Sequence, residues 1–106
     1  MSYDPTYLEF VLEQLRSMLP AVNSRPMFGG VGIYSQGIFF ALIAADVLYF
    51  HVDEASLPEY TALGMRQFGK NYYELPVSVL EDSEQLQQWS SRAVAAAKNK
   101  KKVRKL

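Results

Sequence analysis

The sequence has no cysteine and only one histidine among its 106 residues. Without thiols the chain can form no disulfide, thiolate zinc site, iron–sulfur cluster or cysteine nucleophile. A long apolar run is missing too: the longest extends from Ile38 to Ala45, whereas a spanning helix needs about 20 apolar residues. Met1 is not followed by the basic and then apolar segments of a secretory signal. We therefore expect a cytoplasmic protein that does not enter a membrane.

An excess of one charge sign is also missing, because eleven basic residues balance eleven acidic ones. The two signs are unevenly distributed: residues 1–97 carry five basic and all eleven acidic residues, a net charge of −6. Residues 98–106 form a basic tail, whose cations are Lys98, Lys100, Lys101, Lys102, Arg104 and Lys105. A chain of this length fits one domain. We divide it into a domain over residues 1–97 and the basic tail over residues 98–106.

Apolar spacing predicts the first helix. Asp4 is a helix-capping residue, and Pro5 suits the first helical position. The apolar residues from Leu8 to Leu19 recur three and four positions apart, which places them on one buried stripe. Pro20 is expected to end this helix.

The period changes to two between Arg25 and Val52, and glycine becomes frequent. We predict three strands here, over residues 27–34, 38–44 and 48–52, with tight turns at residues 35–37 and 45–46. Links this short join antiparallel strands. The strand over residues 38–44 is apolar on both faces, which is typical of a central strand.

The rest of the domain repeats the helix and strand signals. Ser56 and Glu59 have the spacing of a capping box, and Gly64 marks the end of a short helix. A hairpin with a two-residue loop at Gly69-Lys70 follows, and Asp82 caps the last helix. The expected order is α-β-β-β-α-β-β-α. It predicts an α+β fold of two layers, with an antiparallel five-stranded sheet and helices packed on one face.

The reactive side chains show no catalytic arrangement. His51 is the single histidine, and its neighbours Phe50 and Val52 indicate a residue within a sheet. The carboxylates near Asp53 and near Asp82 suit turns and helix starts and lack the spacing of a calcium loop. We expect no enzyme activity, no metal and no cofactor.

The glycine cluster from Gly29 to Gly32 is not a phosphate-binding loop, because neither a Gly-Lys-Ser/Thr sequence nor a helix start follows it. Gly29 and Gly30 instead let a neighbouring element approach closely, or permit a bulge. Arg25 precedes them and is expected to form a structural ion pair. A small-molecule pocket around Arg25, Gly29 and Gly30 is the alternative.

Large rings on the predicted strands indicate a contact surface. Tyr49, His51 and Tyr72 are the candidate interaction residues, on the face away from the helices. The strands carry almost no Lys or Arg, which proteins that stack on nucleic-acid bases place between their rings. Core packing and self-association as a homodimer are alternative roles for these rings.

The basic tail supports a second hypothesis about function. Six cations in nine residues can bind the phosphates of DNA or RNA without reading sequence, with an affinity that falls as salt increases. The alternative is a solvated helix end, where the helix dipole favours cations.

The segment from Arg25 to Tyr34, Arg-Pro-Met-Phe-Gly-Gly-Val-Gly-Ile-Tyr, resembles the N-terminal domain of the TfoX/Sxy family. The similarity covers about residues 5–97 and continues through Phe40–Ile43, Leu48–Phe50, Tyr72–Pro76, Trp89 and Ala93. It implies a small α+β domain similar to the secretion-chaperone-like fold, with no enzymatic activity. Members of this family regulate natural competence in bacteria together with the transcriptional machinery. The leading hypothesis is therefore a stand-alone, non-catalytic regulatory domain that binds a protein partner.

Overall fold

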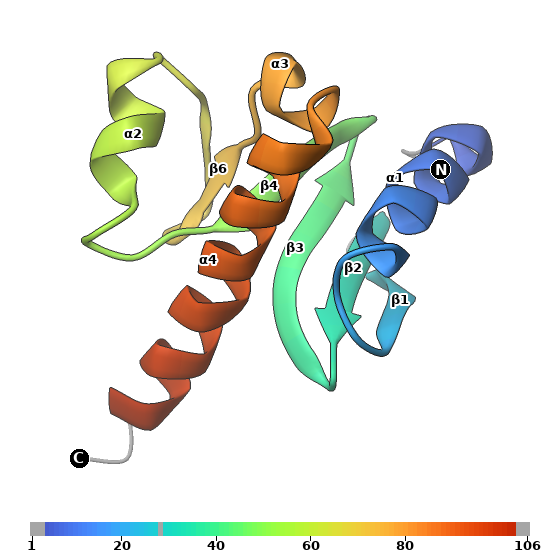
Figure 1. Ribbon diagram of the computed structural model, residues 1–106, viewed down its shortest axis with the longest axis horizontal. Coiled ribbons are helices and arrows are strands. Elements are labelled where there is room, and N and C mark those ends of the chain that lie inside the picture. Colours follow the sequence, from blue (N-terminus) through green and yellow to red (C-terminus); the bar gives the residue numbers. More distant parts are fainter. Residues whose placement is uncertain (1–3, 28, 104–106) are drawn as a thin grey trace.

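The computed structural model describes residues 4–27 and 29–103, with only the backbone described for residues 100–103 (Figure 1). Its helices and strands follow one another as α1 (Pro5–Arg16), β1 (Val22–Met27), β2 (Gly30–Ser35), β3 (Ile38–Ala44), β4 (Val47–His51), α2 (Leu57–Ala62), β5 (Gln67–Phe68), β6 (Tyr72–Glu74), α3 (Val77–Leu80) and α4 (Ser83–Val103). The strands form one antiparallel sheet in the order β1-β2-β3-β4-β6-β5. The predicted α+β fold with an antiparallel sheet is confirmed.

The sheet has six strands within the described residues, so the predicted number of five is wrong. The additional strand is β1, whose sequence Val-Asn-Ser-Arg-Pro-Met does not alternate apolar and polar residues. It lies at the edge of the sheet and pairs with β2. An edge strand needs hydrogen bonds on one side only and therefore tolerates Pro26. Pairing with β2, rather than an apolar pattern of its own, makes this segment a strand.

α1 begins as predicted and ends earlier than predicted. The Asp4 carboxylate accepts a hydrogen bond of 2.9 Å from the amide of Thr6 and caps the first turn. The helix ends at Arg16. A separate turn follows before Pro20, closed by a hydrogen bond of 2.8 Å from the Leu19 amide to the Leu15 carbonyl.

The segment between β6 and α4 contains the short helix α3, which the sequence did not predict. α4 begins as predicted, because the Asp82 carboxylate accepts hydrogen bonds from the amides of Glu84 at 3.1 Å and Gln85 at 3.2 Å. It is the longest described helix and runs to Val103. None of the helices in the described ranges is both long enough and apolar enough to cross a bilayer.

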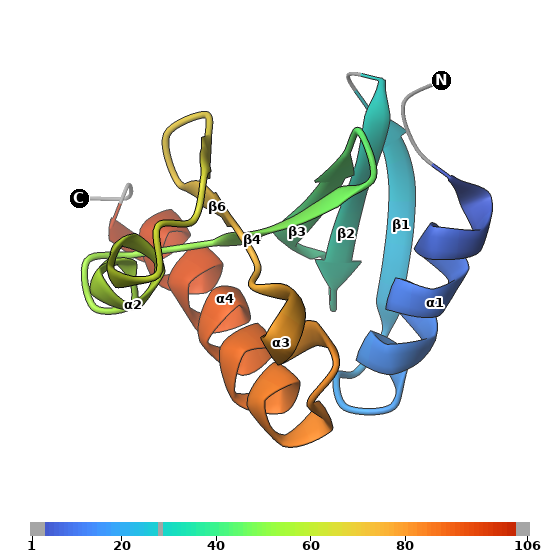
Figure 2. The same ribbon diagram turned by 90° about the horizontal axis from the view of Figure 1, so that it is seen from above.

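Figure 2 shows the helices on one side of a strongly twisted sheet. α4 crosses β3 and β4, and α1 packs against β1. The core lies between these two layers and is formed by residues such as Leu15, Ile33, Ile43 and Leu86, all fully buried. This arrangement leaves the opposite face of the sheet without a helix from the described part of the chain.

Candidate functional site

The sheet face opposite the helices carries a group of aromatic rings. Tyr34 pairs with Phe39, and Tyr72 pairs with both His51 and Phe68. Because directly opposed residues in a sheet share a face, these rings lie on the same side. Tyr49, two residues before His51 on β4, lies on this face as well. We call the set Tyr34, Phe39, Tyr49, His51, Phe68 and Tyr72 the outer aromatic face.

Ring contacts run across the outer aromatic face. The ring centroids lie 5.2 Å apart for Tyr34 and Phe39, and 5.5 Å apart for Phe39 and Tyr72. Phe39 belongs to β3 and Tyr72 to β6, and β4 lies between these two strands. Two strands with one strand between them lie roughly 10 Å apart in a flat sheet. The two rings nevertheless lie in contact across β4, on a sheet that Figure 2 shows to be strongly twisted. The ring contacts of the outer aromatic face therefore extend from β2 to β6.

The three candidate interaction residues differ in exposure. Tyr72 is half-buried, whereas Tyr49 is 9% and His51 is 6% exposed. The Phe68 ring lies 4.9 Å from the Tyr49 ring and covers it. Phe68 itself is 40% exposed, so a partner reaches Phe68 and Tyr72 before it reaches Tyr49. The sequence did not single out Phe68, because only the pairing of β5 with β6 places it on this face.

Tyr72 lies at the centre of these contacts. Its ring meets the ring of His51 edge-on at 5.0 Å, in addition to its contact with Phe39. Burial raises the pKa of Tyr72 to about 12, and the neighbouring Tyr34 adds to this shift. The hydroxyl is therefore protonated at neutral pH, and Tyr72 presents an uncharged ring with one hydrogen-bonding group.

Arg25 lies at the β1 edge of the same face. Its guanidinium carbon is 5.8 Å from the centroid of the Tyr34 ring, the geometry of a cation–π contact. The ion pairs among the described residues join Arg66 to Glu74 and Arg92 to Glu59. The ion pair predicted for Arg25 is therefore not formed with any carboxylate in the described part of the chain.

The glycine segment next to Arg25 has a structural role. Gly30 is buried, and a Cβ atom there would overlap the carbonyl oxygen of Ile43 on β3. The close approach of a neighbouring strand, expected from the sequence, is confirmed at this position. Gly29 is exposed and has a positive φ of 75°.

A pocket of about 620 Å³ lies at a different place, where β4 ends. Its walls come from the loop after β4, the hairpin of β5 and β6, and α4, with Asp53, Lys70 and Asn99 as examples. Arg25 and the glycines are not among its lining residues. Because its walls come from segments far apart in the sequence, no local pattern indicated this pocket.

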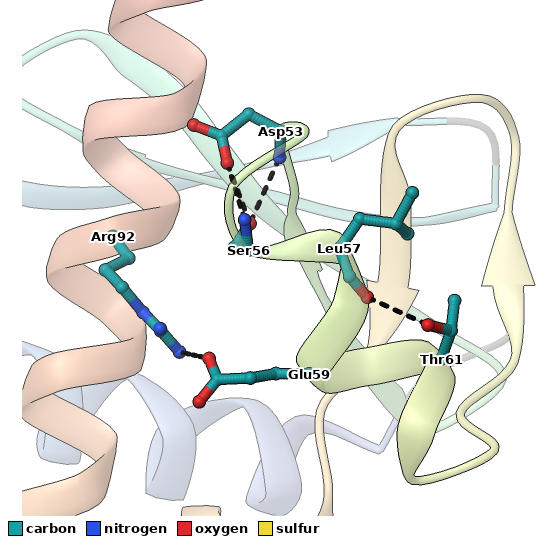
Figure 3. Close-up of polar contacts among 6 residues, drawn as sticks. All are labelled: Asp53, Ser56, Leu57, Glu59, Thr61 and Arg92. Atoms are coloured by element: carbon teal, nitrogen blue, oxygen red, sulfur yellow. Dashed lines mark hydrogen bonds and ion pairs between the residues drawn. The ribbon is translucent and has the colours of Figure 1, made fainter.

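Reciprocal hydrogen bonds hold the loop that follows β4 (Figure 3). The Asp53 amide donates to Ser56 Oγ at 3.1 Å, and the Ser56 amide donates to Asp53 Oδ1 at 2.9 Å. Burial acts to raise the pKa of the Asp53 carboxyl, but the hydrogen bonds from Ser56 and Ala55 outweigh it and leave this pKa below its ordinary value. Asp53 is therefore ionised at neutral pH.

The predicted capping box between Ser56 and Glu59 is not formed. Ser56 makes no side-chain bond to the first turn of α2, because its hydroxyl bonds to Asp53 instead. Glu59 forms an ion pair with Arg92 of α4 (Figure 3). The side chains of Ser56 and Glu59 thus bond to residues outside α2, while the Glu59 amide donates to the Ser56 carbonyl at 3.2 Å.

The basic tail continues α4 in its first part. The helix extends to Val103, and Lys98 is exposed on it. The side chains of Lys100, Lys101 and Lys102 lie outside the described residues, and so do Arg104 and Lys105. The boundary between residues 97 and 98 and the binding of phosphates by the tail stay predictions.

Fold and surface together define a class of protein: a small antiparallel α+β domain with helices on one sheet face and aromatic rings on the other. The model of the TfoX N-terminal domain family matches residues 13–97, which is most of the chain. The chain therefore belongs to the TfoX N-terminal domain family. Comparison with the curated proteins found no matching relative.

Proposed function

We propose that the protein is a non-catalytic, cytoplasmic regulatory domain that binds a protein partner of the transcriptional machinery, as the resemblance to the TfoX/Sxy competence regulators implies. The outer aromatic face is the surface that contacts this partner. Membership of the TfoX N-terminal domain family supports the proposal of a regulatory domain of this type. The accessible rings support the choice of surface.

One observation carries the proposal: a row of partly exposed rings lies on a face that no described helix covers. Tyr34, Phe39 and Tyr72 are half-buried, and Phe68 is 40% exposed. Aromatic residues are enriched at the centres of protein interfaces, where each ring buries a large apolar area. Covering these rings with a partner removes apolar surface from water and so favours binding.

Site-specific photo-crosslinking in the native host tests this surface. A photoreactive phenylalanine analogue replaces Phe68 in the full chain, and a matched control carries it at Val77. Val77 is 64% exposed and belongs to α3, on the helix side of the sheet. We expect a discrete adduct from position 68 and none from position 77.

The mass of the adduct identifies the occupant of the face. An adduct with a different protein supports a partner, and an adduct of twice the chain's mass supports the alternative, a homodimer through the same face. Failure of position 68 to form an adduct, or an equal adduct from position 77, contradicts the proposal.

Nucleic-acid binding through the basic tail is the competing function. Phosphates are repelled by residues 1–97, whose net charge is −6, so any affinity depends on residues 98–106. DNA binding is measured for the full chain and for a variant without residues 98–106, at two salt concentrations. Negligible binding by both proteins excludes this function, whereas binding that is lost on truncation and weakens with salt supports it.

A further inference from the structure

The pocket at the end of β4 has walls that are fixed before any ligand arrives. The Val52 amide donates to the Asn71 carbonyl at 2.7 Å, which ties the end of β4 to the hairpin loop. The Gln67 side-chain amide donates to the Lys70 carbonyl at 3.1 Å and holds the same loop. The reciprocal hydrogen bonds after β4 hold the opposite rim (Figure 3). A preformed pocket loses little conformational freedom on binding.

The size and lining of this pocket suit a small ligand. Its volume of about 620 Å³ falls within the range of roughly 300–1,000 Å³ that is usual for small-molecule sites. Leu57, Tyr73 and Ala96 are apolar or aromatic residues of its lining. Asn71 and Asn99 also line it, and an asparagine side chain has donors and an acceptor. A ligand with apolar faces and hydrogen-bonding edges is complementary to such walls.

The charges around the pocket select against an anionic ligand. Asp53 and Glu54 contribute negative charge, and Lys70 contributes positive charge, so carboxylates outnumber ammonium groups in the lining. A neutral ligand with hydroxyl groups avoids the repulsion that an anion meets, and its hydroxyls can donate to the carboxylates.

A nucleoside combines these properties, since it has a planar base with donors and acceptors at its edge, ribose hydroxyls and no net charge. We propose that the pocket at the end of β4 is a nucleoside-binding site, with the base between the Tyr73 wall and the amides of Asn71 and Asn99. The ribose hydroxyls face the carboxylates of the loop after β4. His51 belongs both to the lining of this pocket and to the outer aromatic face, so the site borders the surface proposed for the protein partner.

An NMR titration of the ¹⁵N-labelled full chain tests the proposal. Adenosine, guanosine, cytidine and uridine are added separately to millimolar concentration, and inorganic phosphate is added as a further arm. We expect saturable amide shifts with at least one nucleoside, confined to the loop after β4, the β5–β6 hairpin and the α4 turn at Asn99. No saturable shift with any nucleoside overturns the proposal. If inorganic phosphate shifts the same amides as strongly as the nucleosides do, the proposal is also overturned, because this result indicates an anion site at Lys70.

Two variants of α4 separate pocket binding from a general change in the protein. Asn99→Trp fills the pocket, whereas Ser91→Trp adds the same ring at an exposed position that does not line it. Both residues are exposed, so both variants are expected to fold, and urea unfolding checks this. We expect Asn99→Trp to weaken nucleoside binding at least about tenfold, or about 1.4 kcal/mol, and Ser91→Trp to leave it unchanged. Unchanged binding by a folded Asn99→Trp variant overturns the proposal, whatever the result of crosslinking at position 68.

Discussion

Gly30 occupies a position where the backbone of the neighbouring strand leaves no room for a side chain. A Cβ atom would overlap the Ile43 carbonyl oxygen, which belongs to a paired strand and cannot rotate away. Gly37 provides a matched control, because it lies in a turn with a φ of 80° and a Cβ atom there would meet nothing within 4 Å. We expect Gly30→Ala to lower the free energy of unfolding by about 2–3 kcal/mol, and Gly37→Ala by about 1 kcal/mol. Urea unfolding measures both values, and equal losses contradict the close approach.

Two single residues, Tyr60 and Tyr72, are expected to make the stability of the fold depend on pH in the alkaline range. Burial raises the pKa of both hydroxyls, in Tyr72 to about 12. A tyrosine in the unfolded chain ionises near pH 10, so above this pH the unfolded state releases protons that the folded state retains. We expect the free energy of unfolding to fall as the pH rises from about 10 toward 12.

Substitution by phenylalanine tests this linkage. Tyr60→Phe and Tyr72→Phe each remove one titrating hydroxyl, and each is expected to make the fall in unfolding free energy shallower. Urea unfolding of the two variants and the unchanged chain between about pH 8 and pH 11 measures the slope. If neither substitution alters the slope, these hydroxyls do not cause it.

At the scale of elements, α2 depends on α4 for its position. A helix of six residues is not stable in isolation. The Tyr60 ring packs edge-on against Trp89 at 4.8 Å, and Arg92 both pairs with Glu59 and lies 5.2 Å from the Trp89 ring centroid. The side chains of the ion pair are 42% and 51% exposed, which limits its contribution.

Substitutions at this junction are expected to differ in cost. Tyr60→Ala removes a core ring and is expected to lower the unfolding free energy by about 3–5 kcal/mol. Arg92→Ala loses an exposed ion pair and a ring contact, which together contribute about 1 kcal/mol. Urea unfolding ranks the two variants. A larger loss for Arg92→Ala than for Tyr60→Ala contradicts the view that packing, and not charge, positions α2.

The elements that were predicted correctly are those whose own residues indicate a helix, strand or turn. The turns at Gln36-Gly37 and Ala45-Asp46 have positive φ at both central residues, which suits two-residue hairpins. β1 became a strand through its pairing with β2, and such pairing leaves no trace in six mostly polar residues. The β5–β6 loop has three residues instead of the predicted two, because Phe68 pairs with Tyr72.

The sequence was sufficient to predict which sheet face carries the candidate residues, but not how exposed each of these residues is. Alternation along β4 was sufficient to place Tyr49 and His51 on the face away from the helices. Their burial depends on rings from β5 and β6, which reach them only after the strand order and the twist of the sheet are established. The pocket at the end of β4 depends on the same long-range arrangement.

At the scale of the whole molecule, two neighbouring phenylalanines of β3 belong to opposite sides of the sheet. The register of β2 and β3 shifts after Ile33, which leaves Phe40 as an extra residue at a bulge. Phe40 is fully buried with its ring 5.8 Å from that of Phe50, whereas Phe39 is half-buried in the outer aromatic face. We expect Phe40→Ala to lower the unfolding free energy by about 3–5 kcal/mol and Phe39→Ala by about 1–2 kcal/mol.

The same pair separates folding from binding. Because Phe39→Ala is expected to leave the domain folded, its effect on the adduct from position 68 reports on the surface alone. Phe39 contacts both Tyr34 and Tyr72, so its removal disrupts the middle of the outer aromatic face. We expect the adduct to disappear while the urea midpoint shows a folded protein. An adduct of unchanged yield from folded Phe39→Ala means that a partner bound near position 68 does not use the rings around Phe39, and the contacts of Phe39 with Tyr34 and Tyr72 then serve only the packing of the sheet.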